Sequence, residues 1–83
     1  MSFVLKRTVS AGLSRDSIGK FLRMMRKSVP LNQQQLADKI GVTHSAISQM
    51  ERGAIYPKLD TLSRIGDACN FELSITAVQR YET

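Results

Sequence analysis

The segment 32–53 constrains the fold of this chain more than any other part of the sequence. Asn32 is a suitable helix N-cap, because its side-chain oxygen accepts a hydrogen bond from an amide of the first turn. Leu36 and Ile40 then recur at helical spacing. Gly41 follows directly, where a helix end needs a residue that adopts positive φ without a steric penalty. The pattern predicts a short helix that ends at Gly41.

A second short helix is predicted shortly after the first. Thr43 is a suitable cap for a helix that begins at His44, and Gly53 ends that helix. Ile47 and Met50 share its inward face. A helix, a glycine turn and a second capped helix together form a helix-turn-helix motif.

The outward face of the second helix has uncharged groups that form hydrogen bonds. It presents His44, Ser45, Ser48 and Gln49, with no charged residue before Glu51. A face that meets only solvent more often has Lys and Glu, whereas Gln, His and Ser hydrogen-bond base edges in the major groove of DNA. Two interpretations follow: a DNA-reading face, which these residue types favour, and an ordinary helical hairpin with a polar exterior.

The chain resembles the Cro/lambda-repressor-like (XRE) helix-turn-helix family over residues 18–70. The residues that carry the resemblance are Leu31-Asn32-Gln33-x-x-Leu36-Ala37-x-x-Ile40-Gly41-Val42-Thr43-x-x-x-Ile47-Ser48-x-x-Glu51-x-Gly53 and then Pro57-x-Leu59-x-x-Leu62. The resemblance implies a mainly α fold, a lambda-repressor-like bundle of four helices. Pro30 departs from the family, which commonly has glycine at that position.

The resemblance also implies roles for individual residues. Those expected to read base edges are His44, Ser45, Ala46, Ser48 and Gln49, with Ala46 suited to a thymine methyl group. Those expected at the DNA backbone are Gln33, Thr43, Arg52 and Lys58. Gln33 is also expected to support the first residue of the recognition helix. Arg26 is expected to pair with Glu51 and join the first helix to the third; DNA contact by Arg26 is the alternative.

A helix is predicted on the N-terminal side of the motif, from about Asp16 to Lys27. Ser14 or Asp16 can cap it, and the helix should end by Ser28 because Pro30 restricts the backbone before it. The apolar stripe of this helix consists of Ile18, Phe21, Leu22 and Met25. Met24 falls off the stripe and is expected to be partly exposed or to face a partner.

A last helix is predicted from Leu59 or Asp60 to Asn70. Its inward face is expected to consist of Leu59, Leu62, Ile65 and Cys69. Gly66 lies in its interior, where close approach of another helix would explain a glycine. Cys69 is the only cysteine, so we expect a buried thiol rather than a disulfide.

Residues 71–77 alternate apolar and polar side chains, which predicts a β-strand. The apolar residues expected to form this dimer strand are Phe71, Leu73, Ile75 and Ala77. A strand needs a partner for its backbone groups. The candidates are the same strand of a second subunit, which would give an antiparallel sheet across a two-fold axis, and the N-terminal segment 3–9. Residues 2–10 are themselves either a strand or a basic arm that reaches DNA through Lys6 and Arg7.

The charge of the chain is unevenly distributed. The net charge is +5 overall, but residues 1–30 hold seven Lys and Arg against one Asp, whereas residues 31–83 have a net charge of −1. This asymmetry points to an anionic partner of the N-terminal part. No apolar run is long enough for a membrane span, and the N-terminal apolar segment is too short for a secretory signal, so a cytoplasmic location is expected.

No arrangement of residues suggests catalysis or metal binding. His44 is the only histidine and lies where DNA is expected. Cys69 has no second Cys or His at metal-ligand spacing. We therefore expect a protein that is not an enzyme and has no cofactor. The expected division of the chain is an arm or strand over 1–13, a DNA-binding domain over 14–70, and a dimerisation strand with a tail over 71–83.

The leading functional hypothesis is a repressor that binds an inverted-repeat operator in double-stranded DNA as a homodimer. A helix-turn-helix followed by the segment Glu-Leu-Ser-Ile-Thr at 72–76 also resembles HipB-type antitoxins. That resemblance implies autoregulation of the protein's own operon and binding of a HipA-type kinase toxin. The alternatives are a phage-type or stand-alone XRE regulator, and a protein-interaction module that has lost DNA binding.

Overall fold

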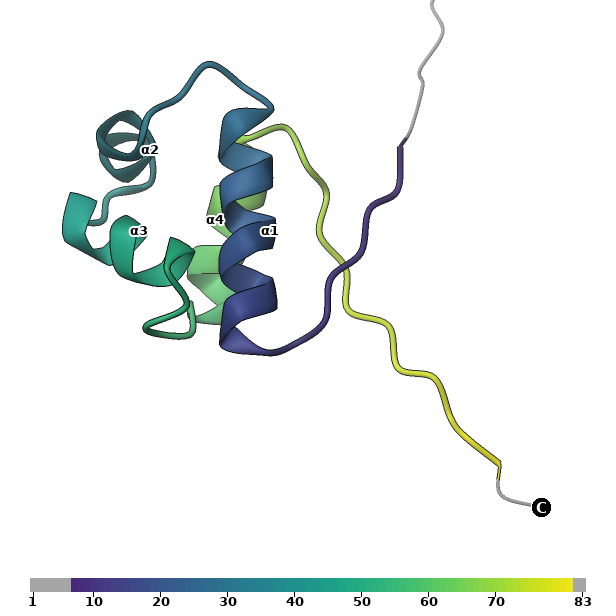
Figure 1. The fold of residues 1–83 in the computed structure, drawn as a ribbon. Helices are drawn as coiled ribbons and strands as arrows, with labels where there is room; N and C mark the ends of the chain where they lie inside the picture. The colour runs from purple at the N-terminus through teal and green to yellow at the C-terminus, as the bar shows by residue number, and fades with distance from the viewer. Residues whose placement is uncertain (1–6, 82–83) are drawn as a thin grey trace, which may run out of the picture.

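The computed structural model describes residues 7–81, which form four helices followed by an extended C-terminal segment (Figure 1). The helices are α1 (Arg15–Lys27), α2 (Gln33–Ile40), α3 (His44–Glu51) and α4 (Leu59–Ala68). The four helices predicted from the sequence are therefore confirmed, with bounds close to those expected. α2 and α3 lie on one side of α1, and α4 lies behind it in the view of Figure 1.

Side-chain caps determine where three of the helices begin. The side-chain oxygens of Ser14, Asn32 and Thr43 each accept a hydrogen bond from a backbone amide one turn ahead, at 3.1, 2.8 and 3.0 Å respectively. The cap of α1 is therefore Ser14. Gln35 Oε1 in turn accepts a hydrogen bond from the Asn32 backbone amide at 2.8 Å, which completes a capping box at α2.

Glycine ends α2 as predicted. Gly41 has φ of 76°, in the left-handed region, and its amide donates to the carbonyl of Ala37. The resulting sharp turn lets α3 begin at His44. α1 ends at Lys27, before Pro30, also as predicted.

The core lies between the four helices. Its buried apolar residues are Leu22, Met25, Leu36, Ala37, Ile40, Ile47, Met50, Ile65 and Cys69. The inward positions predicted for α2 and α3 are confirmed. Met24 is half-buried and packs against this core. Burial raises the pKa of the Cys69 thiol, which therefore stays neutral near pH 7.

α1 and α3 approach so closely that their crossing requires Gly19. A Cβ atom at this position would lie 2.6 Å from the carbonyl oxygen of Glu51 and 2.8 Å from that of Met50. Both distances are shorter than a real contact allows. This backbone-to-backbone contact fixes the position of α3, and it could not be predicted from the residues alone.

Two expectations for α4 are wrong. Leu59 is 67% exposed, because at about 100° per residue it lies roughly 120° around the helix from Ile65. Gly66 does not meet another helix: a Cβ there would lie 2.8 Å from the side chain of Leu73 and 3.1 Å from the carbonyl of Phe71. The glycine therefore makes room for the chain that follows α4. Asn70, with φ of 64°, reverses the chain after the helix.

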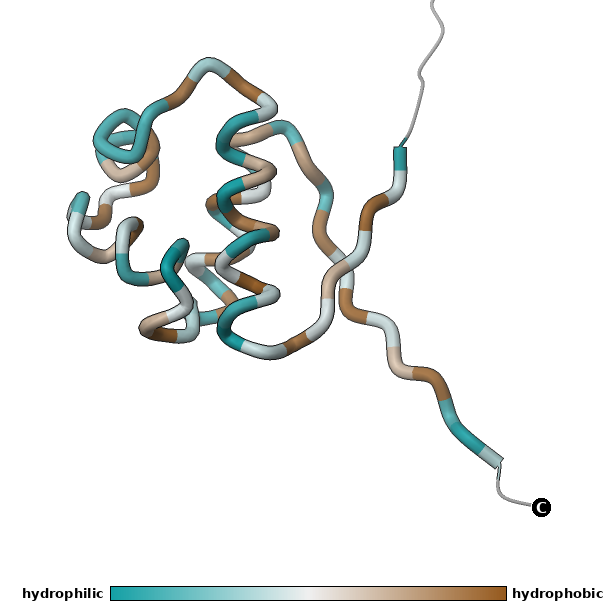
Figure 2. The backbone as a smooth tube through the Cα atoms, viewed as in Figure 1, coloured by the Kyte–Doolittle hydropathy of each residue, from teal (hydrophilic) through white to brown (hydrophobic). Residues whose placement is uncertain are grey.

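The predicted C-terminal strand is not found. Residues 71–81, here called the C-terminal segment, have no regular secondary structure, although hydrophobic residues recur along them (Figure 2). Phe71 and Leu73 pack against the core, whereas Ile75 and Ala77 are exposed. A strand is defined by hydrogen bonds to a neighbour, and within 7–81 no backbone hydrogen bond joins residues 72–81 to another segment.

The N-terminal partner predicted for that strand lies partly outside the described residues, since Lys6 and the residues before it are not among them. Residues 7–10 have no regular secondary structure, and Arg7 is exposed. Residues 9–12 line a shallow groove against α1 with Phe21 and Met24.

Candidate nucleic-acid interface

The outer face of α3 presents the uncharged polar side chains that the sequence singled out. His44 and Ser45 are exposed, and Ser48 and Gln49 are half-buried. Gln49 Nε2 donates a hydrogen bond to Ser45 Oγ at 3.0 Å, so these two side chains lie together on the helix surface. The structure thus gathers four of the five predicted base-reading residues, His44, Ser45, Ser48 and Gln49, on one helix face.

Ala46 lies apart from this group. It is half-buried and packs against the core. Its amide donates to Thr43 Oγ1 in the cap of α3, so the hydroxyl of Thr43 is occupied by the helix itself. Thr43 is otherwise exposed at the start of α3.

A chain of polar contacts runs from the interior to His44. Arg26 donates two hydrogen bonds to the Glu51 carboxylate, from Nε to Oε2 at 2.6 Å and from Nη2 to Oε1 at 2.9 Å. Glu51 Oε1 also accepts a hydrogen bond from Gln33 Nε2 at 3.2 Å. Gln33 Oε1 lies 2.9 Å from His44 Nε2. The first residue of α3 is therefore connected, through α2, to an ion pair between α1 and α3.

The ion pair is almost fully removed from solvent. The side chains of Arg26 and Glu51 are 11% and 5% exposed. Arg26 Nη1 also donates to the Leu31 carbonyl at 3.1 Å. The hydrogen bond to Glu51 raises the pKa of Arg26 against the cost of burial. Burial alone would raise the pKa of Glu51, but the hydrogen bonds from Arg26 and Gln33 and the charge of Arg26 lower it. Both groups are charged at neutral pH.

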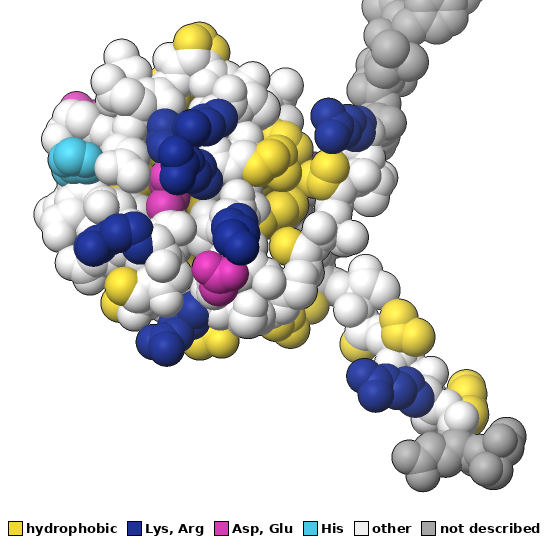
Figure 3. All heavy atoms as spheres, viewed as in Figure 1, with side chains coloured by type: hydrophobic (Ala, Val, Ile, Leu, Met, Phe, Trp, Pro, Cys, Tyr) yellow, Lys and Arg dark blue, Asp and Glu magenta, His cyan; other side chains and the backbone are white. Residues whose placement is uncertain are grey.

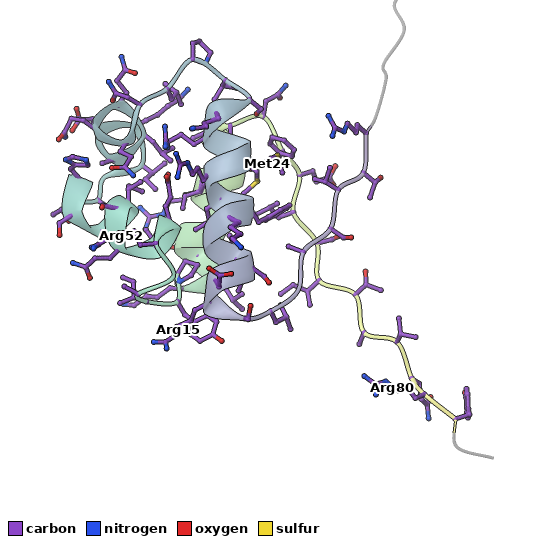
Figure 4. All side chains as sticks on the ribbon, in the orientation of Figure 1. Arg15, Met24, Arg52 and Arg80 are labelled. Atoms are coloured by element: carbon purple, nitrogen blue, oxygen red, sulfur yellow. The ribbon has the colours of Figure 1, made fainter. Side chains whose placement is uncertain are left out.

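Cationic side chains lie on the same side of the molecule as this face. Figure 3 shows Lys and Arg side chains gathered over α1 and α3, with His44 at the edge of the same view. Arg52 and Lys58 are exposed, at the end of α3 and immediately before α4. Figure 4 shows Arg52 beside α3 and Arg15 at the start of α1.

Two cations with structural contacts were not singled out from the sequence. Arg15 Nη1 donates to the carbonyl of Ala54 at 3.3 Å and holds the loop after α3. Arg64 Nη1 donates to the Ile40 carbonyl at 2.7 Å and caps the end of α2. Both acceptors are main-chain carbonyls, which carry no sequence signal, so only the folded geometry identifies these contacts.

The described part of the chain has no group of three or more His, Cys, Asp or Glu side chains placed to hold a metal ion. No helix within residues 7–81 has the length and apolar character needed to cross a membrane.

Comparison with known families decides the classification. The family model described as Helix-turn-helix (HTH_3) matches residues 22–76, which span α2, α3, α4 and the C-terminal part of α1. The chain belongs to the XRE-type helix-turn-helix family. The resemblance noted in the sequence is thereby confirmed, together with the assignment of α3 as the second helix of the motif.

Several curated relatives share this region of the chain. An uncharacterized HTH-type transcriptional regulator of Mycobacterium tuberculosis is 36% identical over 61 residues, which are 74% of this chain and 44% of the relative. The ImmF control region 10 kDa protein of Bacillus phage phi105 is 30% identical over 63 residues, covering 76% of this chain and 70% of the phage protein. The chain thus spans less than half the length of the mycobacterial relative.

Solved structures share the fold. The clp gene regulator ClgR from Corynebacterium glutamicum superposes with a TM-score of 0.68 at 24% identity, over 75% of this chain and 66% of ClgR. A HipB chain from a complex with an O2 20mer superposes with a TM-score of 0.64 at 18% identity, over 92% of this chain and 100% of that chain.

Proposed function

We propose that this protein is a sequence-specific DNA-binding transcriptional repressor of the XRE type. The observation that carries the proposal is the outer face of α3, which gathers His44, Ser45, Ser48 and Gln49. Exposed cations follow in the chain, with Arg52 at the end of α3 and Lys58 immediately before α4. Uncharged hydrogen-bonding groups distinguish base edges, and neighbouring cations attract phosphates without regard to sequence.

In this proposal the two kinds of contact come from different elements. His44, Ser45, Ser48 and Gln49 read bases in the major groove, and Ala46 meets a thymine methyl group at the edge of the helix. The DNA backbone on either side of the groove is held by Arg52, Lys58, Gln33 and the start of α3 at Thr43. In this proposal residues 14–70 form the DNA-binding domain, residues 1–13 an arm or strand, and residues 71–83 a dimerisation strand and tail.

We further propose that the protein binds DNA as a homodimer. Three large apolar side chains of the C-terminal segment are exposed: Ile75 (70%), Val78 (83%) and Tyr81 (82%). The alternation of apolar and polar residues in this segment suits a strand that pairs with a second copy of the chain. A two-fold dimer would place two recognition helices roughly 34–36 Å apart on an inverted repeat. Sedimentation equilibrium tests this: a dimer is expected, and a monomer at every concentration would contradict the proposal.

A HipB-like antitoxin is the more specific form of the proposed function. The superposition on HipB covers 92% of this chain and the whole of that chain. The resemblance in the sequence adds autoregulation and a HipA-type kinase toxin as partner. Co-expression with a kinase-like neighbouring gene tests it: a stable complex is expected, and the absence of any such gene or complex favours a stand-alone regulator.

A phage-type regulator is the second candidate. It is favoured by the similarity to the control-region protein of phage phi105, because the match covers 70% of the phage protein. The proposed DNA binding is common to both candidates.

A mobility-shift titration with a fragment of the gene's own promoter tests DNA binding. We expect a shifted complex at lower protein concentration than with a scrambled fragment of the same length, and weaker binding to both as salt rises. Equal binding to the two fragments would contradict sequence-specific recognition. No binding to either at low salt would favour the protein-interaction module considered from the sequence.

A further inference from the structure

The orientation of the Gln33 amide is determined by Glu51. An ionised carboxylate only accepts hydrogen bonds, and Glu51 is held ionised by the two hydrogen bonds from Arg26. Gln33 must therefore present its NH₂ group to Glu51 Oε1, 3.2 Å away. Reversing the amide would place two acceptor oxygens against each other in a part-buried site.

This orientation determines which nitrogen of His44 holds its proton. The other end of the Gln33 amide is a carbonyl oxygen, which only accepts, and it lies 2.9 Å from His44 Nε2. Nε2 must therefore donate. A neutral imidazole has one N–H, so the neutral form of His44 has its proton on Nε2 and an unprotonated Nδ1.

We infer that the Arg26–Glu51 ion pair, acting through Gln33, makes His44 a hydrogen-bond acceptor toward DNA. His44 is exposed at the start of α3, and among the described residues no hydrogen bond to its Nδ1 is present. In the major groove an acceptor matches the amino groups of adenine N6 and cytosine N4. Guanine and thymine present acceptors at the corresponding sites, O6 with N7 and O4.

The inference rests on the proposed DNA binding and adds a base preference to it. Arg26, Glu51 and Gln33 act here as positioning residues, since none of them needs to touch the base itself. A histidine without this support could place its proton on either nitrogen and accept or donate as the neighbouring base requires. Supported by Gln33, His44 should discriminate between bases that a free histidine would tolerate.

Selection from a randomised duplex library at pH 7.5 tests the inference. The variant His44→Ala first identifies the base pair that His44 reads, as the position whose preference it abolishes. At this position the wild-type protein should prefer one base pair over the others on the order of tenfold, the pair whose adenine N6 or cytosine N4 amino group faces Nδ1. Gln33→Leu should reduce that preference several-fold and leave the preferences at other positions in place.

Gln34→Leu is the matched control. Gln34 is an exposed neighbour on the same helix, whose Nε2 donates to Asp38 at 2.8 Å, and it has no contact with His44 among those of the described residues. Losing a phosphate contact at Gln33 lowers affinity for all sequences alike, whereas losing the support of His44 changes one base preference. An unchanged preference in Gln33→Leu would overturn the inference, as would full retention of the preference when the amino base of that pair is replaced by an analogue without the amino group.

A second measurement does not depend on DNA. His44 is the only histidine, so long-range ¹H–¹⁵N correlation spectra contain one imidazole. In the neutral imidazole of the wild-type protein we expect the proton on Nε2, and in Gln33→Leu we expect a mixture of the two tautomers. A proton on Nδ1 in the wild type would overturn the inference even if DNA binding holds. Failure of the wild type to bind any duplex would instead refute the proposed function.

Discussion

Arg26 and Glu51 join α1 to α3 through two parallel hydrogen bonds, of 2.6 and 2.9 Å, in a site where the Glu51 side chain is only 5% exposed. The Gly19 contact lies at the same crossing, with a Cβ there only 2.6 Å from the Glu51 carbonyl. The Arg26–Glu51 ion pair and the close backbone contact at Gly19 together fix the position of α3, the helix that presents the polar face.

Arg26→Met should destabilise the fold by about 3–5 kcal/mol, because it leaves the buried Glu51 charge without its partner. Chemical denaturation of the wild type and the variant measures this free energy of unfolding. Lys20→Met is the matched control, since it breaks the Lys20–Asp16 pair, whose side chains are 78% and 72% exposed. We expect that control to stay within about 0.5 kcal/mol of the wild type. Equal effects of the two substitutions would contradict the structural role of Arg26.

The stability of the fold should fall in acid because of Glu51. Its pKa is lowered in the folded state, below the ordinary value near 4.5, so the folded protein binds fewer protons than the unfolded chain. The stabilisation is fully present above the unfolded pKa and is lost as the pH falls through the folded pKa.

Denaturation at a series of pH values from 7 to 3 tests this, with the double variant Arg26→Met, Glu51→Leu as control. Over the acidic part of the range, the free energy of unfolding should fall less in the control than in the wild type. The same acid dependence in both proteins would show that other carboxylates are responsible.

Gly19→Ala should lower the free energy of unfolding by about 1–3 kcal/mol. The added methyl group would clash with main-chain carbonyl oxygens of α3, which can move away only if the helix itself shifts. Gly12→Ala is its control: there the nearest atom to a new Cβ is Ser17 Oγ at 3.6 Å, an ordinary contact. Thermal unfolding compares the two. A midpoint for Gly19→Ala as high as that of the control would refute the close crossing of α1 and α3.

Gln49→Ala should weaken binding to the selected operator by about 1–3 kcal/mol and hardly change binding to random duplex. The reason is that a base-reading side chain contributes only where its base is present. Fluorescence anisotropy titrations with both duplexes measure the difference. Equal losses on the two would show that Gln49 does not read a base.

Lys58→Ala provides the contrast to Gln49→Ala. An exposed lysine at the DNA backbone contributes equally to all sequences, so its removal should weaken binding to both duplexes. It should also reduce the slope of log affinity against log salt concentration by roughly one.

The local signals in the sequence predicted the helical motif well. Caps and the left-handed glycine depend on residues within one turn of each other, so Thr43 and Gly41 could be assigned without knowledge of the fold. The pairing of Arg26 with Glu51 followed from the family resemblance and not from spacing, since 25 positions separate the two residues.

Features that depend on distant parts of the chain could not be predicted in this way. The alternation over 71–77 indicates which side chains are apolar, but a strand also needs a partner, and none is present within the described chain. The exposure of Leu59 and the contact of Gly66 with Leu73 depend on where the chain runs after α4. The Gln33–His44 contact was expected, whereas the constraint on the histidine proton emerged only from the order of donors and acceptors.

Mapping of amide chemical shifts shows whether the polar face of α3 contacts duplex DNA. An 83-residue chain suits this measurement, made on the ¹⁵N-labelled protein with and without the selected operator duplex. We expect the largest shifts at residues 43–49, at Gln33 and along 52–58. Shifts confined to α1 or the C-terminal segment, with α3 unchanged, would contradict this contact.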